Sequence, residues 1–160
     1  MAKPKPASRR PAISVVHGPN LNLLGEREPH IYGRITLAEI DGELRRRGEG
    51  AGVDVYSVQS NHEGALIDFV QDARHSSDVL IVNAGGFAHT SVALRDAIAG
   101  IGLPAIEVHL SNLAAREDFR QRTLLGAVCV GQVSGFGARS YWLALDGAIG
   151  LLKEKGRLAQ

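Results

Sequence analysis

Short, uniformly apolar runs alternate along the chain with longer segments in which apolar residues recur every three or four positions. Runs of the first kind are typical of buried strands, and segments of the second kind are typical of amphipathic helices. The apolar runs predict five strands, at about residues 13–16, 53–58, 79–82, 105–108 and 127–133. Residues 79–82 are apolar without exception, which indicates a central strand of a parallel sheet that is covered on both faces.

The segments between the strands carry helix start and stop signals. Thr36 with Glu39, and Ser60 with Glu63, match the capping box that opens a helix. The first helix is predicted to stop at a cluster of glycines, Gly48, Gly50 and Gly52. Further helices are expected around residues 92–98, 116–120 and 139–152.

Strands that alternate with helices indicate an α/β protein with a parallel sheet. At 160 residues the natural packing is a three-layer, doubly wound, five-stranded sheet of flavodoxin-like type, for which we expect the strand order 2-1-3-4-5 by analogy. The chain shows no internal repeat and no linker, so residues 13–155 are expected to form a single domain. Residues 1–12 contain three of the six prolines and four basic residues, which predicts a disordered tail.

Composition narrows the classes of function. Hydrophobic residues make up 44% and charged residues 22% of the chain, as in an ordinary soluble globular protein. A formal net charge of +1 and the lack of a membrane-length apolar run give no reason to expect nucleic-acid or membrane partners. Cys129 is the only cysteine and no apolar signal segment opens the chain, so a cytoplasmic location is expected. All lysines lie near the two ends, at positions 3, 5, 153 and 155, which argues against a buried Schiff-base lysine.

The segment HGPNLNLLGEREPHIYG, residues 17–33, is a long connection between the first strand and the first helix. Long loops in compact domains are often functional. His17 directly follows the strand and is expected to be buried and hydrogen-bonded. Tyr32, near the end of the loop, either packs on the surface or takes part in the chemistry.

Ligands of doubly wound sheets bind beyond the carboxyl ends of the strands. Polar side chains follow four of the predicted strands there: Asn20, Gln59, Asn61, Asn83, His89, His109 and Ser111. Asparagine and serine also cap helices, but capping does not explain His89 and His109, where function is favoured. Gly85 and Gly86 either let a helix begin close to the sheet or leave backbone amides open to an anion. The other polar groups are expected to be solvated: His30, His62, His75, Arg45, Arg46 and Arg47.

Several common sites have no counterpart in the sequence. It has no GxGxxG after the first strand and no GxxxxGK[ST], which argues against dinucleotides and nucleoside triphosphates. No histidine pair at helical spacing and no CxxC offers a metal site, and no GxSxG offers a nucleophilic serine. The sequence therefore predicts neither a metal nor a cofactor.

Five sequence blocks nevertheless form a recognisable series: HGPNLNLLGEREPHIYG, QSNHEG, NAGGFAHTSVALRDA, EVHLSNLAAREDFR and GFGARSYWLAL. In this order and spacing, over about residues 13–152, they resemble the signature blocks of the type II 3-dehydroquinate dehydratases. The small departures are Phe87 and Ala88, where the family often has another aromatic or aliphatic residue and a threonine. The departures leave the matched functional positions intact.

The resemblance implies a reaction. Members of this family remove water from 3-dehydroquinate to give 3-dehydroshikimate, without metal, cofactor or imine, in either aromatic biosynthesis or quinate breakdown. It implies that Tyr32, as tyrosinate, takes the proton alpha to the ketone and that Arg27 holds this tyrosine ionised. Asn20, through a water, stabilises the enolate, and His109, oriented by Glu107, protonates the departing hydroxyl.

The resemblance also implies a substrate-binding set and an assembly. Asn83, Leu110 and Ser111 would hold the substrate carboxylate, and His89 and Arg120 the ring hydroxyls, with Gly85 and Gly86 in support. Asp96 would reach across from a neighbouring subunit, because the family forms trimers that build twelve-subunit shells.

The implied mechanism is physically coherent. Loss of water beta to a ketone needs a base, a group that stabilises the enolate, and an acid for the leaving oxygen. A free tyrosine ionises only near pH 10, but a guanidinium about 4 Å away stabilises a phenolate by about 4 kcal/mol at an effective dielectric constant of about 20. The alternative from another class is a non-catalytic flavodoxin-like module that binds a flavin or small anion. That alternative requires a Ser/Thr-rich first loop, which residues 17–33 lack.

Overall fold

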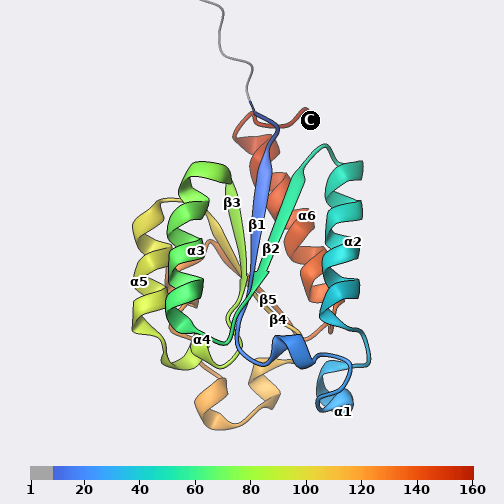
Figure 1. Cartoon of the computed structure of the whole chain (residues 1–160), viewed down its shortest axis with the longest axis vertical. Coiled ribbons are helices and arrows are strands. Elements are labelled where there is room, and N and C mark those ends of the chain that lie inside the picture. Colours follow the sequence, from blue (N-terminus) through green and yellow to red (C-terminus); the bar gives the residue numbers. More distant parts are fainter. Residues whose placement is uncertain (1–8) are drawn as a thin grey trace, which may run out of the picture.

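The computed structural model describes residues 9–160, which form a single sheet flanked by helices (Figure 1). Five parallel strands take the order β2-β1-β3-β4-β5. Their bounds are β1 Ala12–His17, β2 Asp54–Gln59, β3 Val79–Asn83, β4 Ala105–His109 and β5 Gly131–Ser134. Both the parallel sheet and the strand order 2-1-3-4-5 expected from the sequence are confirmed.

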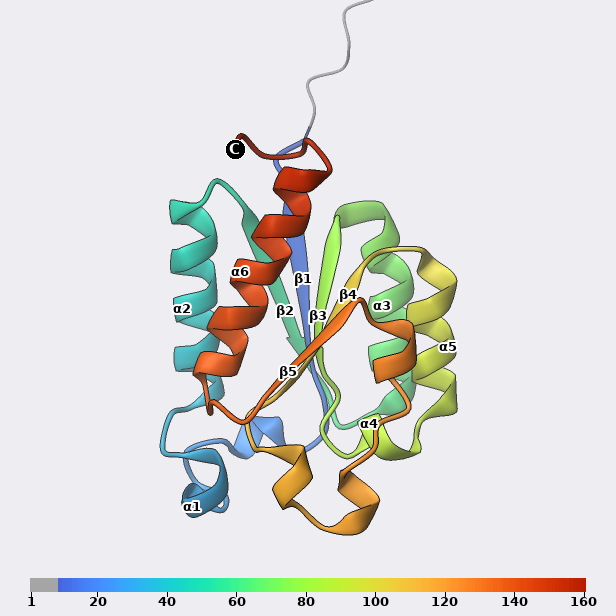
Figure 2. The same cartoon turned by 180° about the vertical axis from the view of Figure 1, so that it is seen from behind.

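Helices cover both faces of the sheet and complete the three layers (Figure 2). One face carries α2 (Leu37–Gly50) and α6 (Arg139–Glu154), and the other carries α3 (Glu63–Ser76) and α5 (Val92–Ile101). The short helices α1 (Pro29–Tyr32) and α4 (Phe87–Thr90) lie beyond the carboxyl ends of the strands. The doubly wound, flavodoxin-like α/β architecture predicted from the sequence is therefore confirmed.

Two apolar cores hold the layers together. Alternate residues of the central strands point to opposite faces, so Val15 packs among the residues of α2 and α6, whereas Val16 packs among those of α3 and α5. Every residue of β1, β3 and β4 is buried. None of the helices within residues 9–160 combines the length and the apolar character that crossing a membrane requires.

The two predicted capping boxes have different outcomes. Thr36 and Glu39 form theirs: the Thr36 hydroxyl accepts the N–H of Glu39 at 3.2 Å, and the Glu39 carboxylate accepts the N–H of Thr36 at 2.8 Å. The prediction for Ser60 and Glu63 is wrong, because α3 begins two residues later than a cap at Ser60 requires and His62 is its N-cap. The Ser60 hydroxyl instead accepts the N–H of His62 at 2.9 Å in a local turn.

The predicted glycine cluster does end α2, at Gly50. The helix continues through Gly48 to Gly50, and a Cβ added at Gly48 would lie 2.5 Å from Cγ2 of Val55. Gly48 therefore allows the helix to approach β2 closely, and the chain turns only at Gly52, where φ is +80°.

The fifth apolar run is only partly a strand. The predicted strand at 127–133 begins at Gly131, because residues Gly126–Val128 form a 3-10 turn from which Val128 packs on the α3 and α5 core. The helix expected around 116–120 is likewise two short 3-10 turns, Leu113–Ala115 and Asp118–Arg120.

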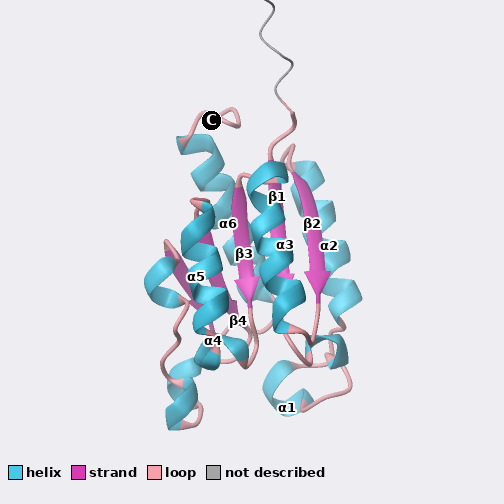
Figure 3. Ribbon diagram, turned by 60° about the vertical axis from the view of Figure 1, so that its left-hand side comes forward, coloured by secondary structure: helices cyan, strands magenta, loops and turns pink. Residues whose placement is uncertain are grey.

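The predicted tail at residues 1–12 falls mainly on residues 1–8, which lie outside the described residues. Arg9 forms two hydrogen bonds with the Asp78 carboxylate, at 2.9 and 3.1 Å, and Ala12 is the first residue of β1. Although burial opposes it, hydrogen bonds from the Ala12 amide and Arg9 hold the pKa of Asp78 below its ordinary value. The start of β1 is thus anchored at the end of the sheet opposite α1 and α4 (Figure 3).

Candidate functional site

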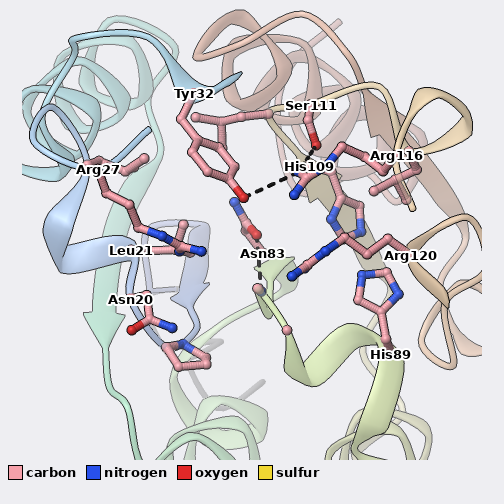
Figure 4. A pocket seen from close by; sticks show the side chains of 16 residues that line it. Asn20, Leu21, Arg27, Tyr32, Asn83, His89, His109, Ser111, Arg116 and Arg120 are labelled. Carbon is pink, nitrogen blue, oxygen red and sulfur yellow. Dashed lines mark hydrogen bonds between the residues drawn. The ribbon is translucent and has the colours of Figure 1, made fainter. Parts of the chain in front are cut away.

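A cleft lies beyond the carboxyl ends of β1, β3 and β4 (Figure 4). The space within it, counted together with its open mouth, is about 680 Å³. It is lined by Pro19, Asn20, Leu21, Leu24, Arg27, Tyr32, Asn83, Gly85, Gly86, His89, His109, Leu110, Ser111, Leu113, Arg116 and Arg120. Most of the predicted site residues are therefore brought together in one place.

Sheet register aligns the strand ends that form the floor of the cleft. His17 pairs with Gln59 of β2 on one side and with Asn83 of β3 on the other. After β1 the chain passes so close to β3 that a Cβ at Gly18 would lie 2.1 Å from the carbonyl oxygen of Ala84. Only glycine fits at position 18, and this contact places the following loop directly over the end of β3.

Asn20 is held in a conformation that is uncommon for a residue with a side chain. Its φ of 68° lies in the left-handed region. The backbone N–H of Asn20 donates to Oδ1 of Asn61 at 3.0 Å, and the side-chain Nε2 of Gln59 donates to the carbonyl of Gly18 at 3.1 Å. The polar residues after β2 therefore hold the first loop in place.

Tyr32 points into the cleft from α1, and two arginines approach it. The Arg27 guanidinium carbon lies 5.4 Å from the Tyr32 ring centroid, as the expected pairing requires. The hydroxyl, however, accepts its hydrogen bond from Nη1 of Arg116, at 3.3 Å. Sequence reasoning missed Arg116, although its place four residues before Arg120 was a signal that both belong to one cationic wall.

Arg116 joins the first loop to the end of β4. Its Nη1 also donates to the Ser111 hydroxyl at 2.9 Å, and its Nε lies 3.3 Å from the Glu117 carboxylate. Burial works against the charge, but the Tyr32 hydroxyl and Glu117 hold the pKa of Arg116 above its ordinary value. Arg116 is therefore a permanent cation at the Tyr32 hydroxyl.

His109 stands at the end of β4 with a buried carboxylate behind it. Nε2 of His109 lies 2.7 Å from Oε1 of Glu107, and the Thr123 hydroxyl donates to Oε2 of Glu107 at 2.9 Å. Glu107 is fully buried and does not line the cleft. With Glu107 ionised, Nε2 must donate to it, which leaves Nδ1 of His109 for a ligand.

His89 presents a defined nitrogen from α4. Its Nδ1 lies 2.8 Å from the carbonyl oxygen of Arg122, which can only accept, so Nδ1 carries a proton. The His89 and His109 rings are 6.2 Å apart between centroids. Arg120 lines the same wall, with its Nε 3.2 Å from the Glu117 carboxylate.

The two predicted supporting glycines, Gly85 and Gly86, act through the path of the backbone. Gly85 has φ +56°, and a Cβ there would approach the carbonyl oxygen of Pro19 at 3.1 Å, so glycine suits this close contact. Its amide donates to Oδ1 of Asn83 at 3.3 Å. Gly86 lines the cleft as the residue before α4.

Asp96 is the one predicted substrate-binding residue that lies away from the cleft. It sits on α5 with its side chain 64% exposed, and its carboxylate is 3.3 Å from Arg95. A single chain therefore does not bring Asp96 to the cleft, and its role in a neighbouring subunit stays a prediction.

The remaining polar residues fall largely where the sequence placed them. His17 is fully buried with both ring nitrogens hydrogen-bonded, and His30, His62 and His75 are exposed. The arginine run on α2 is exposed as expected, but it is more than a solvated face, because the Arg47 guanidinium lies 5.1 Å from the Trp142 ring centroid.

The charges of the cleft define what it can bind. Arg27, Arg116 and Arg120 line it together with two histidines, whereas no acidic side chain does. Within residues 9–160, no group of three histidine, cysteine or acidic side chains is placed to hold a metal ion. The arrangement suits an anionic small molecule with additional polar groups, and it places a tyrosine and a histidine on opposite sides of it (Figure 4).

Comparison with known proteins gives one consistent result. The family model described as Dehydroquinase class II matches residues 11–149. The protein named 3-dehydroquinate dehydratase from Trichodesmium erythraeum is 49% identical over 90% of this chain and 96% of its own. The protein of the same name from Caulobacter sp. (strain K31) is 53% identical over 88% of this chain and 95% of its own. The crystal structure of the type II dehydroquinase from Butyrivibrio crossotus matches with a TM-score of 0.86 at 38% identity, over 89% of this chain and 99% of that one.

Proposed function

Since this chain belongs to the Dehydroquinase class II family, we propose that it removes water from 3-dehydroquinate to give 3-dehydroshikimate. The observation that carries the proposal is that Tyr32 and His109 line the same cationic cleft. The Tyr32 hydroxyl accepts a hydrogen bond from Arg116, and His109 is hydrogen-bonded to Glu107. Membership of this family favours an enzyme over the flavin- or anion-binding module.

Tyr32 is the proposed base. As tyrosinate it takes the proton alpha to the ketone, and the electron pair of that C–H bond forms the enolate. Arg116 touches its hydroxyl and Arg27 faces its ring, so both cations favour the ionised form. The structure thus supports a shared role for two arginines where the sequence suggested Arg27 alone.

Asn20 and His109 are proposed to handle the charge that develops on the two substrate oxygens. Asn20, near the start of the loop that follows β1, stabilises the enolate oxygen through a water. When the enolate collapses, the carbon–oxygen bond of the leaving hydroxyl breaks and His109 supplies a proton from Nδ1, the nitrogen that Glu107 leaves free. Glu107 stabilises the imidazolium that this step requires.

The remaining groups are proposed to bind the substrate. Asn83, with the Leu110 and Ser111 segment at the end of β4, holds the carboxylate. Arg120 and Nε2 of His89, the nitrogen that does not bond to Arg122, hold ring hydroxyls. Asp96 is proposed to complete the site of a neighbouring subunit in trimers that form a twelve-subunit assembly.

The direct test is to add 3-dehydroquinate and follow the ultraviolet absorbance of the conjugated product. We expect the absorbance to rise with the wild-type protein and the rate to fall by several orders of magnitude in Tyr32→Phe. Tyr56→Phe, on the exposed face of β2, is the matched control and should remain fully active. A folded wild-type protein that leaves the substrate unchanged would refute the proposed reaction, and an active Tyr32→Phe would refute the proposed base.

A further inference from the structure

A line of buried hydrogen bonds runs beneath the cleft and ends at Asn83. The Asn83 amide nitrogen Nδ2 lies 3.0 Å from the Tyr141 hydroxyl, which lies 2.7 Å from Nδ1 of His17. Nε2 of His17 lies 2.8 Å from Oδ1 of Asp41. The four residues come from β3, α6, β1 and α2, and this group is called the Asp41 relay below.

The relay is set in an otherwise apolar layer. Tyr141 and His17 are fully buried, Asn83 is 3% exposed, and the side chain of Asp41 at the outer end is 20% exposed. Tyr141 belongs to the core between the sheet and the helices α2 and α6 (Figure 2). Apolar side chains would fill this layer without the desolvation cost of polar groups, so a fully satisfied polar line through it indicates a constraint on something other than packing.

With His17 neutral, the donors in the relay can be arranged in only one direction. The carboxylate of Asp41 only accepts, and its pKa is held below its ordinary value although burial opposes this, because His17 donates to it. Nε2 of His17 must therefore donate to Asp41, and Nδ1 accepts from the Tyr141 hydroxyl. Burial raises the pKa of that hydroxyl, so Tyr141 keeps the proton that it donates. Its oxygen then accepts from Nδ2 of Asn83.

This direction determines how the Asn83 amide faces the cleft. Its Oδ1 accepts the amide N–H of Gly85 at 3.3 Å, and one hydrogen of Nδ2 goes to Tyr141. The second Nδ2 hydrogen remains for a ligand. A flipped amide would set Nδ2 against the N–H of Gly85. Through Tyr141 and a neutral His17, it would also turn a ring lone pair toward Asp41.

We propose that Asp41, His17 and Tyr141 are positioning residues that lock the Asn83 amide with its N–H directed at an acceptor oxygen of the ligand. The inference rests on the proposed function to the extent that this oxygen belongs to the substrate carboxylate. None of the three residues touches the substrate. They act only through Asn83.

The first test is Tyr141→Phe, which removes a single oxygen atom and leaves the packed ring. The KM for 3-dehydroquinate should rise about tenfold, the scale of one hydrogen bond, while kcat stays within about twofold. The reason for this split is that a carboxylate contact is equally strong in the ground state and in the transition state. A purely structural role would lower the melting temperature and the active fraction, and would leave KM unchanged.

A double-mutant cycle shows whether Tyr141 acts through Asn83. The variant with both Tyr141→Phe and Asn83→Ala should have the KM of Asn83→Ala alone, because the relay then has nothing to position. Effects on KM that multiply would overturn the proposal.

Asp41→Asn tests the direction of the relay at its outer end and does not depend on Tyr141→Phe folding. The amide keeps the size of the carboxylate but can donate, so the fixed direction is lost and KM should rise about threefold. Asp72→Asn, an exposed aspartate on α3, is the matched control and should leave KM unchanged. An unchanged KM in a folded Asp41→Asn variant would overturn the proposal.

A readout independent of turnover separates this inference from the proposed function. Nitrogen-15 NMR of labelled histidine should show His17 with its proton on Nε2. A proton on Nδ1 would overturn the relay. Absence of wild-type turnover together with the Nε2–H form would instead refute only the proposed reaction.

Discussion

Replacement of Arg116 by glutamine separates the two arginines that surround Tyr32. The variant removes the cation that touches the tyrosine hydroxyl and retains a side chain that can still bond to Ser111. If Tyr32 acts as tyrosinate, loss of this cation lowers the fraction of enzyme that carries the active base.

The expected loss of kcat in Arg116→Gln follows from the 3.3 Å distance between Nη1 of Arg116 and the Tyr32 hydroxyl. Two unit charges at this distance interact by about 5 kcal/mol at an effective dielectric constant of about 20, and by about 1 kcal/mol in bulk water. The Arg116 side chain is only 13% exposed, so the value lies toward the larger figure. A loss of about 4 kcal/mol corresponds to about a thousandfold lower kcat near neutral pH.

Arg27→Gln should have a much smaller effect, about tenfold. Arg27 faces the ring and not the hydroxyl, its side chain is 35% exposed, and its charge is partly offset by Glu28 at 3.3 Å. Arg116→Lys should recover part of the rate because it keeps the charge, and Arg74→Gln on the exposed face of α3 is the matched control.

The assay is kcat from product absorbance between about pH 6 and pH 9. The deficit of Arg116→Gln should appear in kcat, because the lost cation contacts the hydroxyl of the proposed base. A variant with a raised KM and an unchanged kcat would show that Arg116 acts only by binding substrate. A larger loss in Arg27→Gln than in Arg116→Gln would refute the assignment of the principal cation.

Three further predictions test other parts of the molecule. Borohydride added with 3-dehydroquinate should leave activity intact, because no lysine lines the described cleft, and substrate-dependent inactivation with covalent labelling would contradict this. Light scattering should show a particle much larger than a dimer, and a fully active monomer would remove Asp96 from the site. Asp78→Asn should destabilise the fold by about 1–2 kcal/mol near neutral pH, since the pKa of Asp78 is lowered by the Ala12 amide and Arg9 against the effect of burial. This stabilisation is present above the unfolded carboxyl pKa of about 3.9 and is lost as the pH falls through the lower folded pKa. The unfolding curves of the variant and the wild type should therefore converge in acid. A difference in stability that stays constant with pH would contradict the assignment.

Local sequence patterns predicted the architecture well, because apolar runs and helix caps decide where the strands and helices form. The uniformly apolar run at 79–82 became the central strand β3, and the capping box at Thr36 opens α2 as expected. Where local patterns failed, a contact distant in sequence decided the structure. The apolar run at 127–133 pairs in the sheet only from Gly131, because Val128 and Cys129 pack on the core under α3 and α5 instead.

The same distinction separates the site residues that the sequence revealed from those that it did not. Asn83 and His109 stand at the ends of predicted strands, which mark the rim of a doubly wound sheet, whereas the role of Tyr32 was implied only by the family resemblance. Arg116 reaches the Tyr32 hydroxyl across 84 residues of sequence, and His17 reaches Tyr141 across 124. Such pairings depend on register and helix placement, which no single stretch of sequence specifies.

The position of the cleft follows from the strand order. After β1 the chain crosses to the α2 face, and after β3 it crosses to the face of α4 and α5 (Figure 1). The loops that leave these adjacent strands therefore diverge, and the cleft lies where they separate. Tyr32 enters this cleft from the first loop and His89 from the other side, while His109 rises from β4 beside them. The meeting of the proposed base and acid in one cleft is therefore a consequence of the winding of the sheet. The Asp41 relay lies directly under the same switch point, because His17 and Asn83 are the last residues of the two strands that diverge there.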